Sequence, residues 1–134
     1  MQFDKIINRM ANNEILIKKY HNPQAPYAIE EIIEKGHKIN LDGTIWLYHG
    51  TTKDKADKII KDQYFKSPPD APDSYGIYFS TSDEVSDSYG DGTLVKALIK
   101  VKDLFLDDAF PGRDRMDFYV KTHNHIYHPV KIIK

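Results

Sequence analysis

A pair of tyrosines and a serine between them have the types and spacing to bind a flat ligand. Tyr78 lies near the end of the short apolar run at 76–80, and Ser86 and Tyr89 follow one helical turn apart. Residues three or four positions apart share one face of a helix. If the chain turns back after the run, both rings border one cleft. Aromatic faces attract flat, cationic rings, and such a contact contributes about 0.5–2 kcal/mol.

The segments around these tyrosines have the patterns of strands and short helices. The aromatic, β-branched run at 45–50 predicts a strand, and it breaks at Gly50 into a segment that begins with threonines suited to cap a helix. The run at 76–80 predicts a second strand. A helix should follow it, because Thr81 and Glu84 have the spacing of a capping box.

The remaining parts of the chain predict helices first and strands last. Apolar stripes at 3–10 and 29–33 predict amphipathic helices, and Gly36 is a natural C-terminal stop for the second. Alternating or branched runs predict further strands at 93–101, 117–121, 125–127 and 130–133. We therefore expect an α+β fold in a single domain at 1–134, with a helical N-terminal extension at 1–44 and a strand-rich core at 45–134.

Composition restricts the partners and the chemistry. The formal charge is −1, from 19 basic and 20 acidic residues, so the whole molecule does not attract polyanions. Cysteine is absent, which excludes thiolate chemistry and disulfides. His123, His125 and His128 do not share one face of a strand, so no metal site is expected. Because the sequence shows no apolar run of membrane length and no secretory signal at its start, we expect no membrane partner and a cytoplasmic location.

Two motifs, taken together, resemble those of the ADP-ribosyltransferases of the poly(ADP-ribose) polymerase and diphtheria-toxin type. The first family motif is a strand ending in His-Gly before a helix with Ala-x-x-Ile, here His49-Gly50 and the helix at 56–59. The second is Gly-Ile-Tyr-Phe before a helix with Ser-x-x-Tyr, here 76–79 and 86–89. The resemblance covers roughly 45–134 and implies a split antiparallel β-sheet core with short helices.

The same resemblance implies that NAD is the co-substrate. It assigns NAD contacts to His49, Gly50, Thr51, Tyr78, Ser86 and Tyr89. In this assignment His49 binds a ribose hydroxyl, the Gly50 backbone and the Ser86 hydroxyl bind the nicotinamide carboxamide, and the two tyrosines hold the ring between them. Only glycine lets a backbone approach a planar amide without an intervening side chain.

The third family motif departs from its usual form. The family carries a glutamate in Glu-Tyr-x-x-Tyr-Asp-Pro, and aligning its Tyr-Asp-Pro with 127–129 here puts His123 in the place of the glutamate. A second registration uses the strand at 117–121 and gives the role to Asp117. A carboxylate would stabilise the oxocarbenium-like transition state, and neutral histidine could accept the same ribose hydrogen bond. Both residues remain catalytic candidates, beside His49 and Tyr78.

Three functions remain open at this point. The resemblance favours a mono-ADP-ribosyltransferase that releases nicotinamide, with a protein as the expected acceptor and a nucleic acid as the alternative. The missing glutamate favours an inactive relative that binds NAD, ADP-ribose or a protein partner. An RNA 2′-phosphotransferase also uses NAD on a similar fold, but it needs a basic pocket, and the chain has three arginines, Arg9, Arg113 and Arg115.

Overall fold

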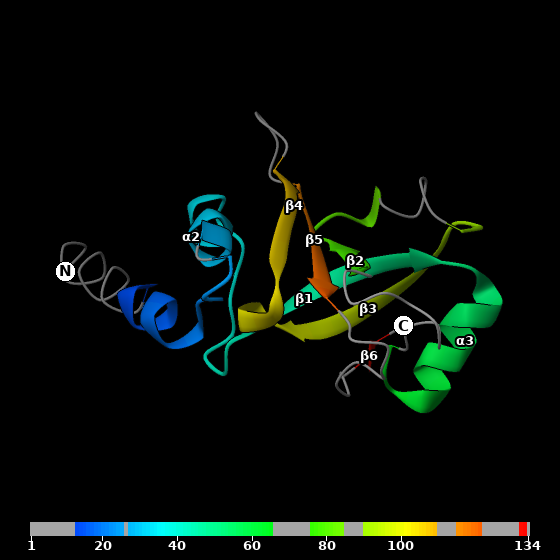
Figure 1. Ribbon diagram of the computed structural model, residues 1–134. Coiled ribbons are helices and arrows are strands. Elements are labelled where there is room, and N and C mark those ends of the chain that lie inside the picture. Colours follow the sequence, from blue (N-terminus) through cyan, green and yellow to red (C-terminus); the bar gives the residue numbers. More distant parts are fainter. Residues whose placement is uncertain are drawn as a thin grey trace, which may run out of the picture.

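The computed structural model of the chain describes residues 13–25, 27–65, 76–84, 90–109, 115–121 and 132–133. These residues form an α+β fold around a six-stranded sheet in the order β4-β5-β2-β1-β3-β6 (Figure 1). The strands are β1 (Thr44–Thr51), β2 (Gly76–Ser80), β3 (Thr93–Lys100), β4 (Phe105–Ala109), β5 (Met116–Lys121) and β6 (Ile132–Ile133). The helices are α2 (Tyr27–Glu34), α3 (Lys53–Asp62), the short 3₁₀ turn η2 (Val101–Asp103) and a helical stretch at 13–20. None of the helices in these ranges has the length and apolar character to span a membrane.

The sheet consists of two halves that meet at one point. β1 pairs with β3 from Thr44↔Lys100 to Thr51↔Thr93, and β2 pairs with β5 along its full length. By contrast, the pairing of β1 with β2 is the single position Tyr48↔Ser80. In Figure 1, β4 and β5 run nearly upright whereas β1 and β3 run across the view. The halves β4-β5-β2 and β1-β3-β6 therefore diverge on either side of Tyr48.

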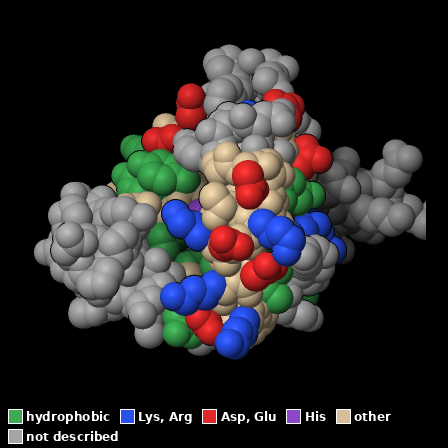
Figure 2. Space-filling model, turned by 90° about the vertical axis from the view of Figure 1, so that its right-hand side faces the viewer, with side chains coloured by type: hydrophobic (Ala, Val, Ile, Leu, Met, Phe, Trp, Pro, Cys, Tyr) green, Lys and Arg blue, Asp and Glu red, His purple; other side chains and the backbone are tan. Residues whose placement is uncertain are grey.

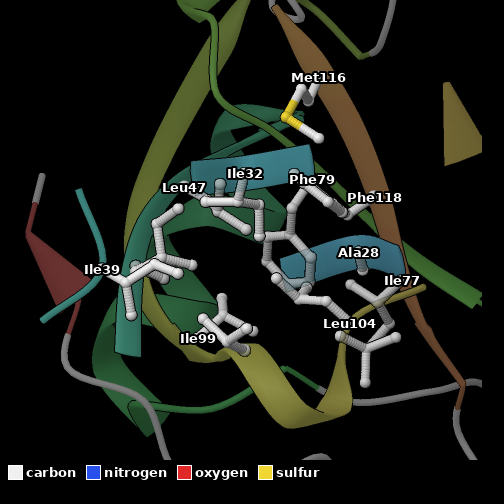
Figure 3. Packing of buried hydrophobic residues seen from close by; sticks show 14 of the residues in the cluster. Ala28, Ile32, Ile39, Leu47, Ile77, Phe79, Ile99, Leu104, Met116 and Phe118 are labelled. Atoms are coloured by element: carbon white, nitrogen blue, oxygen red, sulfur yellow. The ribbon is translucent and has the colours of Figure 1, made fainter. Parts of the chain in front are cut away.

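One hydrophobic core joins the two halves to the N-terminal helices. Alternate residues of the strands are buried on the same side, and Leu16, Ile29 and Ile32 from the helical part belong to the same cluster. Figure 3 shows Ile32 of α2 pointing toward Leu47 of β1 and Phe79 of β2. Burying side chains of this size stabilises the fold by about 1.5–3 kcal/mol each, so α2 helps to hold the halves together.

Helix ends follow the sequence predictions closely. Gly36 follows α2 with a φ of 83°, and the amides of Gly36 and His37 donate to the carbonyls of Ile33 and Ile32, which is a Schellman C-cap. At the other helix, Thr52 caps α3 by accepting a hydrogen bond from the Lys55 amide at 3.3 Å. The expected stripe at 3–10 and the expected strand at 125–127 lie outside the described residues.

The expected capping box after β2 is wrong. The Thr81 hydroxyl accepts a hydrogen bond from the Met116 amide at 2.8 Å, so it fastens the beginning of β5 to the end of β2. Ser82 accepts from the Glu84 amide at 3.1 Å and is the residue that caps the turn at 83–84. Tertiary contact with β5 thus outweighs the local spacing of Thr81.

Sequence patterning also missed β4. This strand carries two consecutive aspartates at 107 and 108, and its pairing with β5 shifts register between Leu106 and Asp108. A bulge breaks the period-two alternation that would have indicated a strand.

Gly90 packs the loop before β3 against the turn after β1. Its φ is 66°, and a Cβ built on it would lie 2.3 Å from the backbone carbon and oxygen of Thr51. Beside it, the Asp91 carboxylate accepts a hydrogen bond from the Lys53 amide at 3.0 Å. Only glycine permits both this backbone conformation and this close approach.

We predict that Gly90→Ala destabilises the protein more than Gly92→Ala. Gly92 also has a left-handed φ, of 90°, but no atom lies within 4 Å of the position that a Cβ would occupy there. Both variants incur the left-handed cost of about 1–2 kcal/mol, and only Gly90→Ala adds overlap with the backbone, which costs about 1–3 kcal/mol more. Urea unfolding of the two variants measures the difference. If both variants lose the same unfolding free energy, the loop that contains residue 90 moves away from Thr51 without an energetic cost.

Candidate functional site

His49 spans the gap where the two halves of the sheet diverge. If pairing continued past Tyr48↔Ser80, His49 would face Phe79 and then Gly50 would face Tyr78. Instead, Nδ1 of His49 lies 2.7 Å from the carbonyl oxygen of Tyr78. A carbonyl oxygen only accepts hydrogen bonds, so Nδ1 carries the proton and donates it. The side chain of His49 thereby replaces a backbone ladder bond between β1 and β2.

Two phenylalanine rings surround the imidazole. The ring of Phe65 meets it edge-on at a centroid distance of 5.0 Å, and the ring of Phe79 lies at 5.5 Å. This burial lowers the pKa of His49 below its ordinary value, the hydrogen bond to Tyr78 opposes that shift, and the positive charge of Lys55 adds to it. His49 is therefore neutral near pH 7, and with Nδ1 protonated its Nε2 is a hydrogen-bond acceptor.

Tyr78 presents its ring on the opposite face of the sheet from the core. Its neighbours Ile77 and Phe79 are buried, whereas Tyr78 is 43% exposed. Counting on from Tyr48↔Ser80, the register would put Gly50 opposite Tyr78, and glycine has no side chain to cover the ring from β1. The Tyr119 ring lies beside the Tyr78 ring at 5.7 Å, and these two side chains line the outer face of their half-sheet.

Thr51, which follows Gly50, contacts the loop before β3. It is 7% exposed, and its carbonyl oxygen accepts a hydrogen bond from the Asp91 amide at 3.4 Å. Ser86 and Tyr89, predicted to bind the nicotinamide group, lie outside the described residues. Gly90, bonded to Tyr89, packs against Thr51. The structure therefore brings His49, Gly50, Thr51 and Tyr78 together, with Gly90 at their edge.

Asp117, one of the two candidates for the role of the missing glutamate, is held by an arginine. Both of its carboxylate oxygens accept hydrogen bonds from Arg115, each at 3.1 Å, and the same guanidinium lies 3.4 Å from Glu84. Hydrogen bonding to Asp117 raises the pKa of Arg115. Asp117 is thus paired with a cation two residues away, which it shares with Glu84. His123, the other candidate, lies in the part of the chain that the structure does not describe.

Phe65 is the residue of this site that sequence reasoning missed. It is 2% exposed and follows the end of α3, in a segment with no strand or helix pattern of its own. An isolated aromatic residue shortly after a helix is a weak signal, because it is equally typical of ordinary core packing. The ion pair between Arg115 and Asp117 was also missed, although their i, i+2 spacing before a strand places both on one face.

Comparison of the chain with protein-family models, with curated proteins and with solved structures finds no match in any of the three. Within the ranges given above, no three histidine, aspartate or glutamate side chains gather as metal ligands. The function must therefore be argued from the geometry around His49.

We predict that His49 makes stability depend on pH. Because its pKa is lowered in the folded state, the unfolded chain takes up a proton at higher pH than the folded protein does. The stability that neutral His49 contributes is present above about pH 6.5 and is lost as the pH falls through the folded-state pKa. The difference in unfolding free energy between wild type and His49→Gln should accordingly shrink between about pH 7.5 and about pH 5.

Urea titrations at both pH values measure this difference. His21→Gln changes an exposed histidine that lies outside the sheet, and it controls for the loss of one imidazole. A difference that grows as the pH falls would mean that His49 is charged in the folded protein.

Proposed function

We propose that the protein is a mono-ADP-ribosyltransferase, which moves one ADP-ribose from NAD to a macromolecular acceptor and releases nicotinamide. The observation that carries the proposal is a neutral imidazole that joins the two diverging halves of the sheet by bonding to the backbone of Tyr78, whose own ring is exposed. His49 and Tyr78 come from two motifs far apart in sequence, yet one hydrogen bond of 2.7 Å joins them. The division of the sheet into two three-stranded halves also supports an ADP-ribosyltransferase-like fold.

Each residue has a role in binding NAD that its environment supports. Nε2 of His49 accepts a hydrogen bond from a ribose hydroxyl, because Nδ1 is occupied by Tyr78. The ring of Tyr78 stacks on the cationic nicotinamide ring, and Gly50 leaves room for the carboxamide against its backbone. Ser86 and Tyr89 complete this pocket in the proposal, with the Ser86 hydroxyl on the carboxamide and the Tyr89 ring on the far side of nicotinamide.

The bond between ribose and nicotinamide breaks through an oxocarbenium-like state. His123 in its neutral form accepts a ribose hydroxyl hydrogen bond in place of the family glutamate, and Asp117 is the second candidate. The pairing of Asp117 with Arg115 ranks it lower, since both of its carboxylate oxygens already accept hydrogen bonds. A site without a free carboxylate stabilises the positive transition state less well, which favours transfer of a single ADP-ribose.

The surface near the site favours a protein acceptor over a polyanion. Figure 2 views the molecule from the α3 end and shows basic and acidic side chains interspersed over that face. On α3 itself, Lys53 pairs with Asp57 at 3.1 Å. A mixed surface lacks the single-sign field that draws phosphate backbones, so it gives no support to the RNA 2′-phosphotransferase alternative.

We predict that wild-type protein transfers label from radiolabelled NAD to at least one species in a cell lysate, and that Tyr78→Ala weakens NAD use. Loss of stacking on nicotinamide should raise KM for NAD about 2- to 30-fold, the equivalent of about 0.5–2 kcal/mol. Tyr27→Ala is the matched control, because Tyr27 lies on α2 and is 72% exposed. Wild-type protein that neither labels an acceptor nor releases nicotinamide would contradict the proposed reaction.

A second candidate function is binding of NAD without turnover. The specific observation in its favour is the pairing of Asp117 with Arg115, which engages both oxygens of the one candidate catalytic carboxylate that lies in the described part of the chain. Calorimetry separates the two functions. NAD binding that depends on Tyr78, with no nicotinamide released, identifies a binding module.

We predict that His123→Gln lowers kcat more than Asp117→Asn does. If His123 assists bond breaking, its loss should reduce kcat about 100-fold or more, whereas Asp117→Asn acts mainly by releasing Arg115. Nicotinamide release at saturating NAD measures kcat for each variant, and thermal unfolding checks that Asp117→Asn remains folded. The reverse order of effects would assign the catalytic role to Asp117.

A further inference from the structure

We infer that Phe65 is a positioning residue that holds the His49 imidazole in its hydrogen bond to Tyr78. This inference rests on the proposed function for its consequence in catalysis, but its structural content can be tested without NAD. Phe65 contacts neither strand by backbone pairing. It reaches the site because the chain reverses direction at the end of α3.

The reversal has a clear local cause. α3 ends at Asp62, and Gln63 adopts a left-handed conformation with a φ of 59°. The Gln63 amide donates to the Ile59 carbonyl at 2.7 Å, and its side-chain amide donates to the Ile60 carbonyl at 2.7 Å. This C-cap turns the chain back, so that Phe65 is buried at the end of β1 rather than continuing away with the helix.

Three rings from three separate elements contact one another. His49 lies 5.0 Å from Phe65 and 5.5 Å from Phe79, and the two phenylalanines lie 5.1 Å apart at an interplanar angle of 85°. Because each ring contacts both others, the imidazole cannot rotate by half a turn about its Cβ–Cγ bond without displacing a buried phenylalanine. A turned imidazole would place a carbon against the Tyr78 carbonyl and lose the hydrogen bond.

Phe65 also covers part of the imidazole and so limits its contact with water. Burial is the main cause of the lowered pKa of His49. A smaller or non-aromatic side chain at position 65 would admit water beside the ring and stabilise the charged form. The same residue therefore controls both the direction of Nε2 and its capacity to accept a hydrogen bond at neutral pH.

The test replaces Phe65 and follows the imidazole directly. Nitrogen-15 NMR of the wild type should show His49 as a neutral ring protonated at Nδ1, with its signals assigned by their absence in His49→Gln. In Phe65→Leu, the pKa of His49 should rise toward its ordinary value and the fraction protonated at Nδ1 should fall. Phe65→Met, which fills more of the same volume, serves if the leucine variant does not fold.

The matched control is Phe118→Leu. Phe118 is a fully buried phenylalanine of the same core, on β5, which is separated from β1 by β2. It should lower stability as Phe65→Leu does and leave the His49 titration unchanged. The inference is overturned if His49 titrates in the Phe65 variants as it does in the wild type, while these variants lose as much stability as Phe118→Leu.

Measurements of NAD cleavage distinguish a failure of this inference from a failure of the proposed function. If wild-type protein cleaves NAD, Phe65→Leu should lower kcat/KM about tenfold, and Phe118→Leu should leave it within about twofold. If Phe65→Leu loses the Nδ1-protonated form of His49 but keeps its activity, the role of Phe65 in catalysis would be overturned. If wild-type protein does not cleave NAD, the proposed function fails, and the NMR titration still decides whether Phe65 holds the imidazole.

Discussion

The hydrogen bond from His49 to the Tyr78 carbonyl is the interaction on which the candidate site depends. β1 and β2 are neighbours in the sheet, yet one pair, Tyr48↔Ser80, is their whole backbone connection. Beyond it the halves diverge, and a polar side chain provides the next link at 2.7 Å. An open edge between two strands exposes backbone groups that a ligand can use, provided that something fixes its width. His49 meets this requirement, and its second nitrogen, Nε2, remains a hydrogen-bond acceptor.

The surroundings of His49 explain why a histidine can link β1 to β2 without a charged partner. Phe65 and Phe79 cover part of the ring, and this partial burial disfavours the imidazolium. A neutral ring that donates through Nδ1 must accept through Nε2, so one bond to the backbone determines the chemistry at the other nitrogen. The core beneath supports this arrangement, because residues of α2 and both half-sheets belong to one buried cluster.

Local pattern predicted most of the strands and helices but not their long-range contacts. β1, α3 and β2 follow from short-range signals: branched residues, the Thr52 cap and the glycines at their ends. The motifs also indicated that His49 and Tyr78 belong to one site. What local signals missed depends on tertiary contact: Thr81 bonds to Met116 instead of capping a helix, the bulge in β4 hides its alternation, and Phe65 reaches His49 only because Gln63 reverses the chain. The pairing of Asp117 with Arg115 is an exception, because it is local and needs only the extended backbone that places both side chains on one face.

A crystal structure of the protein soaked with NAD tests the central claim most directly. We expect the nicotinamide ring to lie against the Tyr78 ring and a ribose hydroxyl to lie within hydrogen-bond distance of His49 Nε2, with Nδ1 still bonded to the Tyr78 carbonyl. NAD bound elsewhere on the molecule, or an imidazole that leaves Tyr78 to bind it, would contradict the account.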